Sequence, residues 1–170
     1  MADNFDNYFA FAGAYENQAD AEADFATIKD AKAIGLIGKY QSAVFTKEAD
    51  GKVKILNTDS TTRSTGAKWG AATGAVLGLI FPAGLLAGLI WGTGIGALAG
   101  NLGKGWGHRD IKDLGEALDA GESGVILVAE ATPDVAAKNI LKMATKAEKK
   151  QIDADAKDIE AAIDAEANAQ

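Results

Sequence analysis

The 170-residue chain carries a net charge of −7 and contains no cysteine. This length accommodates one domain with an insertion and a tail. The acidic balance, without a basic stripe or an aromatic platform, disfavours nucleic-acid binding, and the absence of cysteine excludes disulfides and thiolate metal sites. Residues 1–15 include Asp3 and Asp6 but no lysine or arginine, so they lack the basic start of a secretory signal. We therefore expect a protein that stays in the cytoplasm or faces it.

The first segment of the chain predicts a strand followed by a helix. Residues 8–15 are apolar and aromatic, which favours a strand. Residues 17–37 carry apolar side chains at helical spacing, and Asn17 stands where an N-cap is expected. Gly35 and Gly38 mark the end of this helix.

Two further strands are predicted to form a hairpin. Residues 40–48 resume the apolar–polar alternation of a strand. Asp50 and Gly51 then form the favoured two-residue turn signal, and residues 53–57 supply the partner strand. The order of elements up to this point is β-α-β-β.

The next segment combines regularly spaced glycines with a complete absence of charge over residues 69–103. Four-residue spacing places glycines above one another on a helix, which leaves a groove where a second backbone approaches closely, as in membrane helix pairs. Pro82 divides the segment into two arms, so we predict a glycine-zipper helical hairpin over residues 63–107 with its turn at Pro82. The predicted helix-packing and oligomerisation residues are Gly66, Gly70, Gly74, Gly78, Gly84, Gly88, Gly92, Gly96 and Gly100.

The surroundings of this hairpin favour a membrane. As a helix of about 1.5 Å per residue, the second arm (83–103) would span roughly 31 Å, close to the roughly 30 Å thickness of a bilayer core. The first arm (69–81) is shorter. Basic residues at both ends of the segment predict that both ends face the cytoplasm. The predicted lipid-interface residues are Trp69, Trp106, Lys104, His108 and Arg109.

The remaining chain completes the predicted fold class, α+β. Residues 111–118 predict a short helix, residues 125–129 a buried strand, and Thr132 with Pro133 the start of another helix. With the hairpin removed, this order matches a ferredoxin-like βαββαβ sheet, here with an inserted glycine-zipper α-hairpin and a C-terminal helix. The predicted domains are a discontinuous ferredoxin-like domain (7–62 and 108–131), the hydrophobic hairpin (63–107), and a C-terminal helix with an acidic, alanine-rich tail (132–170).

The tail has two interpretations. Ile152, Ala156, Ile159 and Ile163 recur at spacings of four, three and four, which is the spacing of a narrow helical seam. Such a seam would pack against the domain or against a second copy of the chain. The alternative is a solvated helix that packs on nothing.

In combination, these features resemble a bacterial family of uncharacterised proteins, domain of unknown function 1269. The resemblance covers about residues 7–146 and leaves out the acidic tail. It implies a ferredoxin-like domain interrupted by a membrane-type hairpin, and it implies no catalytic residues. The matching segments are 49–54, the glycine-rich hairpin, 110–118, 123–128 and 131–134.

Candidate chemistry is weak elsewhere in the chain. Residues 94–99 match the dinucleotide pattern G-x-G-x-x-A, but they lie within the glycine ladder, which produces such matches freely. His108 is the only histidine, so a histidine-based metal cluster or catalytic triad would rest on one residue. We interpret it as an interfacial or capping residue at the exit of the hairpin; the alternative is that it contacts an anionic lipid headgroup together with Arg109. The carboxylates of the tail match a solvated helix face. We therefore predict no catalytic residues, no metal and no cofactor.

Three functions from different classes remain open. The first is a non-catalytic, membrane-associated and self-associating protein whose hairpin enters or docks on the bilayer from the cytoplasmic side of the cell membrane. The second is a soluble cytoplasmic homo-oligomer, a scaffold or cage-like assembly, in which the hairpins bury one another and sheet edges at the strands around Tyr40 and Val125 add contacts. The third is an enzyme or ligand carrier. We favour the first, with further copies of the chain and the lipid bilayer as partners.

Overall fold

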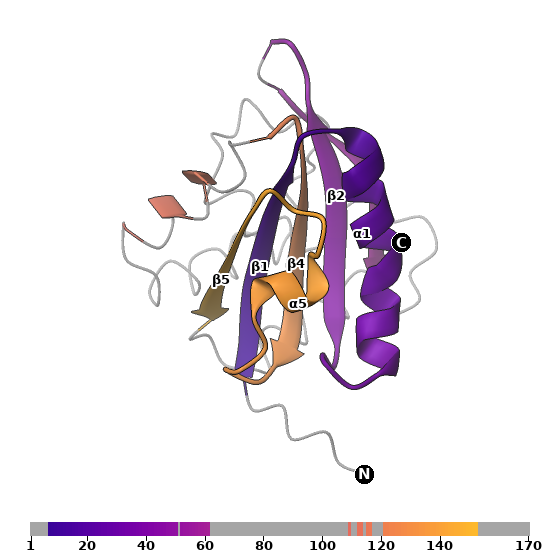
Figure 1. Ribbon diagram of the computed structural model, residues 1–170, viewed down its shortest axis with the longest axis vertical. Coiled ribbons are helices and arrows are strands. Elements are labelled where there is room, and N and C mark those ends of the chain that lie inside the picture. The colour runs from indigo at the N-terminus through magenta and orange to yellow at the C-terminus, as the bar shows by residue number, and fades with distance from the viewer. Residues whose placement is uncertain are drawn as a thin grey trace, which may run out of the picture.

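The computed structural model describes residues 7–50, 52–61, 109, 112–113, 115–116 and 121–152. Its centre is a five-stranded sheet in the order β3-β2-β4-β1-β5, and every neighbouring pair is antiparallel (Figure 1). The strands are β1 (Asn7–Tyr15), β2 (Tyr40–Lys47), β3 (Val53–Ser60), β4 (Ser123–Ala131) and β5 (Lys146–Ile152). The helices are α1 (Gln18–Ala33) and α5 (Ala137–Ile140).

Strand β1 lies inside the sheet and pairs with a neighbouring strand on each side. It pairs with β4 over its whole length, from Asn7 opposite Ala131 to Tyr15 opposite Ser123. Its other side pairs with β5, and β2 pairs with β4. The strands around Tyr40 and Val125 are therefore interior strands, and the prediction that they form the sheet edges is wrong. In the described part of the chain the edges are β3 and β5.

Helix α1 begins and ends where local chemistry requires. The Asn17 side chain accepts a hydrogen bond from the Asp20 amide at 2.8 Å, which confirms the predicted N-cap. At the other end Gly35 adopts a φ of 81°, and the Leu36 amide donates to the Ala31 carbonyl at 2.9 Å. This Schellman arrangement ends the helix at Ala33, four residues before the predicted end.

One face of the sheet, here called the near face, is covered by α1 and α5 (Figure 1). Ile28 of α1 and Ile140 of α5 belong to the same buried apolar cluster as the strand residues of this face. Burial of these side chains supplies most of the driving force for the packing of helices on sheet. The near-face strand residues are Phe9, Phe11, Tyr15, Tyr40, Val44, Val125, Leu127, Ala129 and Ala131.

The opposite face of the sheet, here called the far face, is also apolar. Successive side chains of a strand point to opposite faces, so the alternate residues of each strand gather there. Its apolar residues on β1, β2, β4 and the ends of β3 and β5 are at most 3% exposed, although neither α1 nor α5 packs on this side. Strand β5 also places Lys146, Glu148 and Lys150 on this face, opposite Ala14, Ala12 and Ala10, and these three side chains are exposed or half-buried. The buried apolar far-face residues are Tyr8, Ala10, Ala12, Ala14, Ala43, Phe45, Val53, Ile126, Val128 and Ile152.

The predicted ferredoxin-like βαββαβ fold is wrong. The described residues form five antiparallel strands, the helix α1 of 16 residues and the helix α5 of four, with a few further helical residues between 109 and 116. The main difference lies after Thr132, where the sequence predicts a C-terminal helix. Residues 146–152 instead form β5, because their backbone completes the hydrogen bonding of β1. Ile152, predicted to begin a helical seam, is a buried far-face residue.

The predictions of a helical hairpin and a glycine zipper are wrong together with the predicted fold class, because the structure consists mainly of its five-stranded sheet. Among the residues that the structure describes, no helix is long and apolar enough to cross a membrane. The predicted hairpin itself, residues 63–107, lies outside the described residues, as do the domain boundaries on either side of it. Of the predicted helix at 111–118, residues 112–113 and 115–116 are described and are helical.

Candidate functional site

Most of the predicted site residues lie outside the described part of the chain. This holds for all nine packing glycines, for Pro82 at the predicted turn, and for four of the five lipid-interface residues. The fifth, Arg109, is described and exposed. Its contact with lipid stays a prediction.

A groove of about 470 Å³ opens between α1 and the strands β2 and β3. A volume of this size is within the range of small-molecule sites. Four lining residues come from α1 at spacings of three, four and seven, so they share one side of the helix. The lining residues are Glu22, Phe25, Ala26, Lys29, Val44, Asn57, Thr58 and Asp59.

The polar chemistry beside this groove centres on Tyr40 and Asp59. The Tyr40 hydroxyl donates to the Asp59 carboxylate at 2.6 Å. Burial raises the pKa of the Tyr40 hydroxyl well above its ordinary value, and the hydrogen bond and negative charge of Asp59 raise it further. Tyr40 is therefore a fixed hydrogen-bond donor and not a base at neutral pH. No three metal-ligating side chains gather among the described residues.

A second polar group, Asp24, is buried inside the near-face core. It is 4% exposed and accepts hydrogen bonds from the Tyr15 hydroxyl at 2.7 Å and from the Met143 amide at 2.9 Å. These bonds join α1 to β1 and to the loop between α5 and β5. The sequence carries a signal for this role, because Asp24 lies between Ala21 and Ile28 on the buried stripe of α1, where an unpaired carboxylate would be costly.

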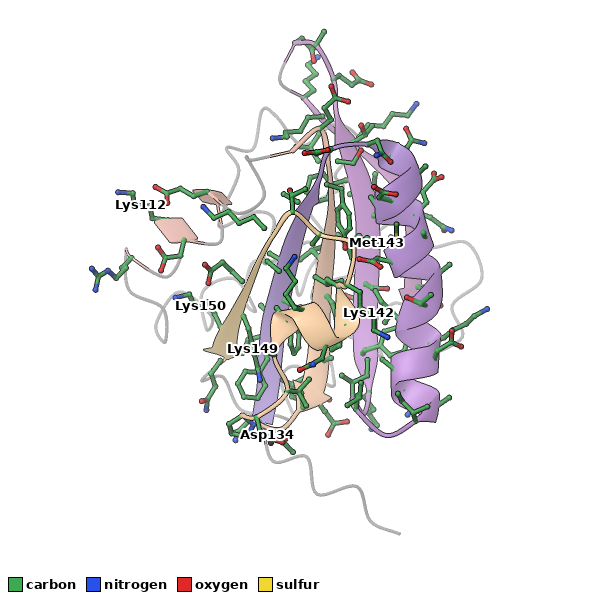
Figure 2. The ribbon with its side chains drawn as sticks, viewed as in Figure 1. Lys112, Asp134, Lys142, Met143, Lys149 and Lys150 are labelled. Carbon is green, nitrogen blue, oxygen red and sulfur yellow. The ribbon has the colours of Figure 1, made fainter. Side chains whose placement is uncertain are left out.

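Lys149 of β5 holds the segment before α5 against the sheet through hydrogen bonds. Its ammonium lies 4.2 Å from the centre of the Phe9 ring and donates to the carbonyls of Thr132, Pro133 and Val135. Partial burial lowers the pKa of Lys149, while the charge of Asp134 opposes that shift. Figure 2 shows Asp134 near Lys149. These contacts of Lys149 hold the chain in place, and they provide no argument for a binding or catalytic role.

The neighbouring Lys150 makes a contact of another kind. Its ammonium forms a salt bridge with Asp113 at 3.0 Å, with 21% and 35% of the two side chains exposed. Lys150 lies beside β5 at the edge of the sheet (Figure 2). The pair therefore links β5 to the chain that returns toward β4.

The connection between β3 and β4 begins and ends at opposite ends of the sheet. After β3, the Thr61 amide donates to the Tyr40 carbonyl at 3.0 Å. Before β4, the Glu122 amide donates to the Tyr15 carbonyl at 3.0 Å. Tyr40 pairs with Ala129, six residues along β4 from Ser123, which pairs with Tyr15. At about 3.4 Å per residue, these two ends are about 20 Å apart along the strands.

Comparison with known proteins gives a family and no closer relative. The family model described as "Protein of unknown function (DUF1269)" matches residues 67–164. This range includes the uncharged stretch, β4, α5 and β5. No curated protein and no solved structure matches the chain.

Proposed function

We propose that this chain, which belongs to the family of proteins of unknown function DUF1269, is a non-catalytic protein that associates with membranes and with itself. The working segment is residues 63–107, within the connection between β3 and β4. The observation that carries the proposal is the stretch 69–103, in which 35 consecutive residues carry no charge.

The contrast between this stretch and the folded domain supports the proposal. Fourteen side chains of valine, leucine, isoleucine, phenylalanine or tryptophan lie within residues 69–103. Each contributes about 1.5–3 kcal/mol when it is removed from water. Among the described residues, Ile34 and Met143 are the exposed large hydrophobic side chains. The described residues thus expose few large apolar side chains, whereas the stretch supplies an excess that lipid or other copies of the chain would accommodate.

The flanking charges favour the cytoplasmic face of the cell membrane. Arg63 and Lys68 precede the uncharged stretch, and Lys104 and Arg109 follow it. Short basic segments on both sides of an apolar stretch are retained on the cytoplasmic side. Both ends of the segment would therefore remain with the folded domain in water.

Self-association is supported by the glycine content of the same segment. The nine regularly spaced glycines from Gly66 to Gly100 carry no side chain. Chains that meet at such residues approach closely and gain dense packing, which is the main attraction between apolar segments in lipid. The second candidate function, a soluble assembly of many copies, uses the same packing without lipid.

Flotation of the untagged chain through a density gradient, before and after alkaline carbonate, tests the proposal. We expect the chain to float with lipid after carbonate. Leu89→Asp places a charge in the apolar stretch and should abolish flotation. Ile34→Asp is the matched control, because Ile34 is 74% exposed on the folded domain, and it should float like the parent chain. A large lipid-free particle at the bottom of the gradient would instead establish the soluble assembly.

A further inference from the structure

We propose that residues 62–120 dock on the far face of their own sheet, with the uncharged stretch 69–103 over its alanine-rich centre. The occupant is a segment of the same chain. This docking goes beyond the association with membranes and does not depend on it.

The far face has the character of an internal packing surface. Ala10, Ala12 and Ala14 of β1 form its centre, and each is fully buried. Phe45 and Ile126, on neighbouring strands, are fully buried as well. Because α1 and α5 pack on the near face (Figure 1), neither helix accounts for this burial. Lys146, Glu148 and Lys150 of β5 flank the β1 alanines at the edge of this face, but they do not reach Phe45 and Ile126 on the inner strands β2 and β4. We therefore infer that another segment of the molecule excludes water from the far face.

The composition of the chain identifies that segment. Residues 153–170 contain six carboxylates, which an apolar sheet face would desolvate at high cost. Residues 1–6 are too few to cover five strands. Residues 69–103 carry no charge. Their glycines also allow a backbone to lie close against the short methyl groups of β1, which satisfies the dense packing of protein interiors.

The path of the chain supports the same occupant. The connection leaves the sheet after β3, at one edge, and Asp113 reaches Lys150 of β5, at the other edge. It then enters β4 at the end of the sheet opposite to its departure. The two described ends of this connection, Thr61 and Asp113, therefore lie at opposite edges of the sheet. The near face is occupied by α1 and α5, so the far face is the route that the described elements leave open.

This docking fixes the orientation of the domain, a consequence that rests on the proposed function. The uncharged stretch lies between the sheet and the bilayer, and α1 and α5 face water. Exposed carboxylates such as Glu22 and Asp30 then point away from the lipid. The sheet, rather than a flexible tether, presents the stretch to the membrane.

Thiol accessibility tests whether the far face is covered in the full chain without lipid. The chain has no cysteine, so each variant carries a single thiol. Ala12→Cys probes the far face, Ala129→Cys the core beneath the helices, and Ala23→Cys an exposed position on α1. We expect the thiol at position 12 to react as slowly as the thiol at 129, about 100-fold slower than at 23. Labelling at 12 as fast as at 23 would overturn the docking.

Photo-crosslinking identifies the occupant. A diazirine-bearing phenylalanine analogue replaces Phe45 on the far face or, as the matched control, Phe11 on the near face. We expect crosslinks from position 45 to peptides of residues 62–120, and from position 11 to peptides of residues 18–33 or 133–145. Mixtures of isotopically light and heavy chains distinguish crosslinks within one chain from crosslinks between chains. Crosslinks from 45 to residues 153–170, or exclusively between chains, would overturn the proposal.

The two proposals fail separately. Crosslinks within the chain from a protein that does not float would uphold docking and refute membrane association. Flotation of a chain whose thiol at position 12 reacts freely would support membrane association and refute docking. If the analogue at position 45 prevents folding, the same analogue at Tyr8, another buried far-face residue, provides the second site.

Discussion

The Tyr15 hydroxyl donates a 2.7 Å hydrogen bond to the Asp24 carboxylate, and both residues are buried in the core. The same carboxylate oxygen accepts the Met143 amide at 2.9 Å. One charged group thus joins β1, α1 and the loop that leads into β5. Loss of this carboxylate would leave the buried Tyr15 hydroxyl and the part-buried Met143 amide without their acceptor, and a buried donor without an acceptor is costly.

We expect Asp24→Ala to lower the free energy of unfolding by about 2–4 kcal/mol, because the Tyr15 hydroxyl and the Met143 amide both lose their acceptor. Tyr15→Phe removes one donor and should cost about 1–2 kcal/mol. Urea denaturation of both variants and of the double variant measures these costs. The coupling between the two sites should be favourable by more than about 0.5 kcal/mol. Simple additivity of the two changes would contradict the role assigned to this pair.

Local sequence signals were sufficient for the first half of the fold. Asn17 caps α1 as predicted, since the cap depends on one side chain and the amide of Asp20. The hairpin between β2 and β3 also follows from local chemistry, with Asp50 accepting the Lys52 amide at 3.0 Å. Features that depend on a few neighbouring residues can be predicted without knowledge of the tertiary structure.

Strand β5 and the groove could not be predicted from local sequence, because both depend on residues that are distant in the chain. The sequence of β5, Lys146–Ile152, consists mainly of lysine, alanine, glutamate and glutamine, which favour helices, and pairing with β1 overrides that preference. The four groove residues on α1 share a helix side that the sequence reveals. Their partners Asn57 and Asp59, by contrast, come from β3, which only the sheet order places opposite them.

The stability of the domain should fall in alkaline solution because of Tyr15 and Tyr40. Burial, followed by the hydrogen bond to Asp24, raises the pKa of Tyr15 above its ordinary value, as burial and Asp59 raise the pKa of Tyr40. The folded state therefore keeps protons that the unfolded state loses above about pH 10. The contribution of each tyrosine to the free energy of unfolding is fully present below that pH. Above it, this contribution falls by up to about 1.4 kcal/mol per pH unit.

Urea midpoints between about pH 9 and pH 11.5 measure this dependence, with tyrosinate absorbance recorded in parallel. We expect Tyr15→Phe and Tyr40→Phe each to reduce the alkaline slope, and the double variant to reduce it most. A Tyr15→Phe variant with the slope of the parent chain would show that this hydroxyl ionises normally in the folded state.

Gly124 makes room for the Phe45 ring on the far face. A Cβ atom at position 124 would lie 2.4 Å from the ring atom Cζ of Phe45, which is fully buried and opposite Gly124 in the sheet. Gly124→Ala should therefore cost about 1–3 kcal/mol through overpacking, and Phe45→Leu in the same chain should recover part of that loss. Denaturation of the two single variants and the double variant measures the recovery.

The same substitution also connects stability to the docked segment. A ring displaced by the new methyl group moves away from the sheet and toward the surface on which residues 69–103 are proposed to pack. In the Ala12→Cys background, Gly124→Ala should therefore speed thiol labelling at position 12, and Phe45→Leu should slow it again. Gly35→Ala is the control, since Gly35 has a φ of 81° and open space around its missing Cβ. It should cost about 1 kcal/mol through backbone strain and leave the labelling ratio between positions 12 and 129 unchanged. Equal effects of the two glycine substitutions on that ratio would show that the Phe45 ring does not support the docked segment.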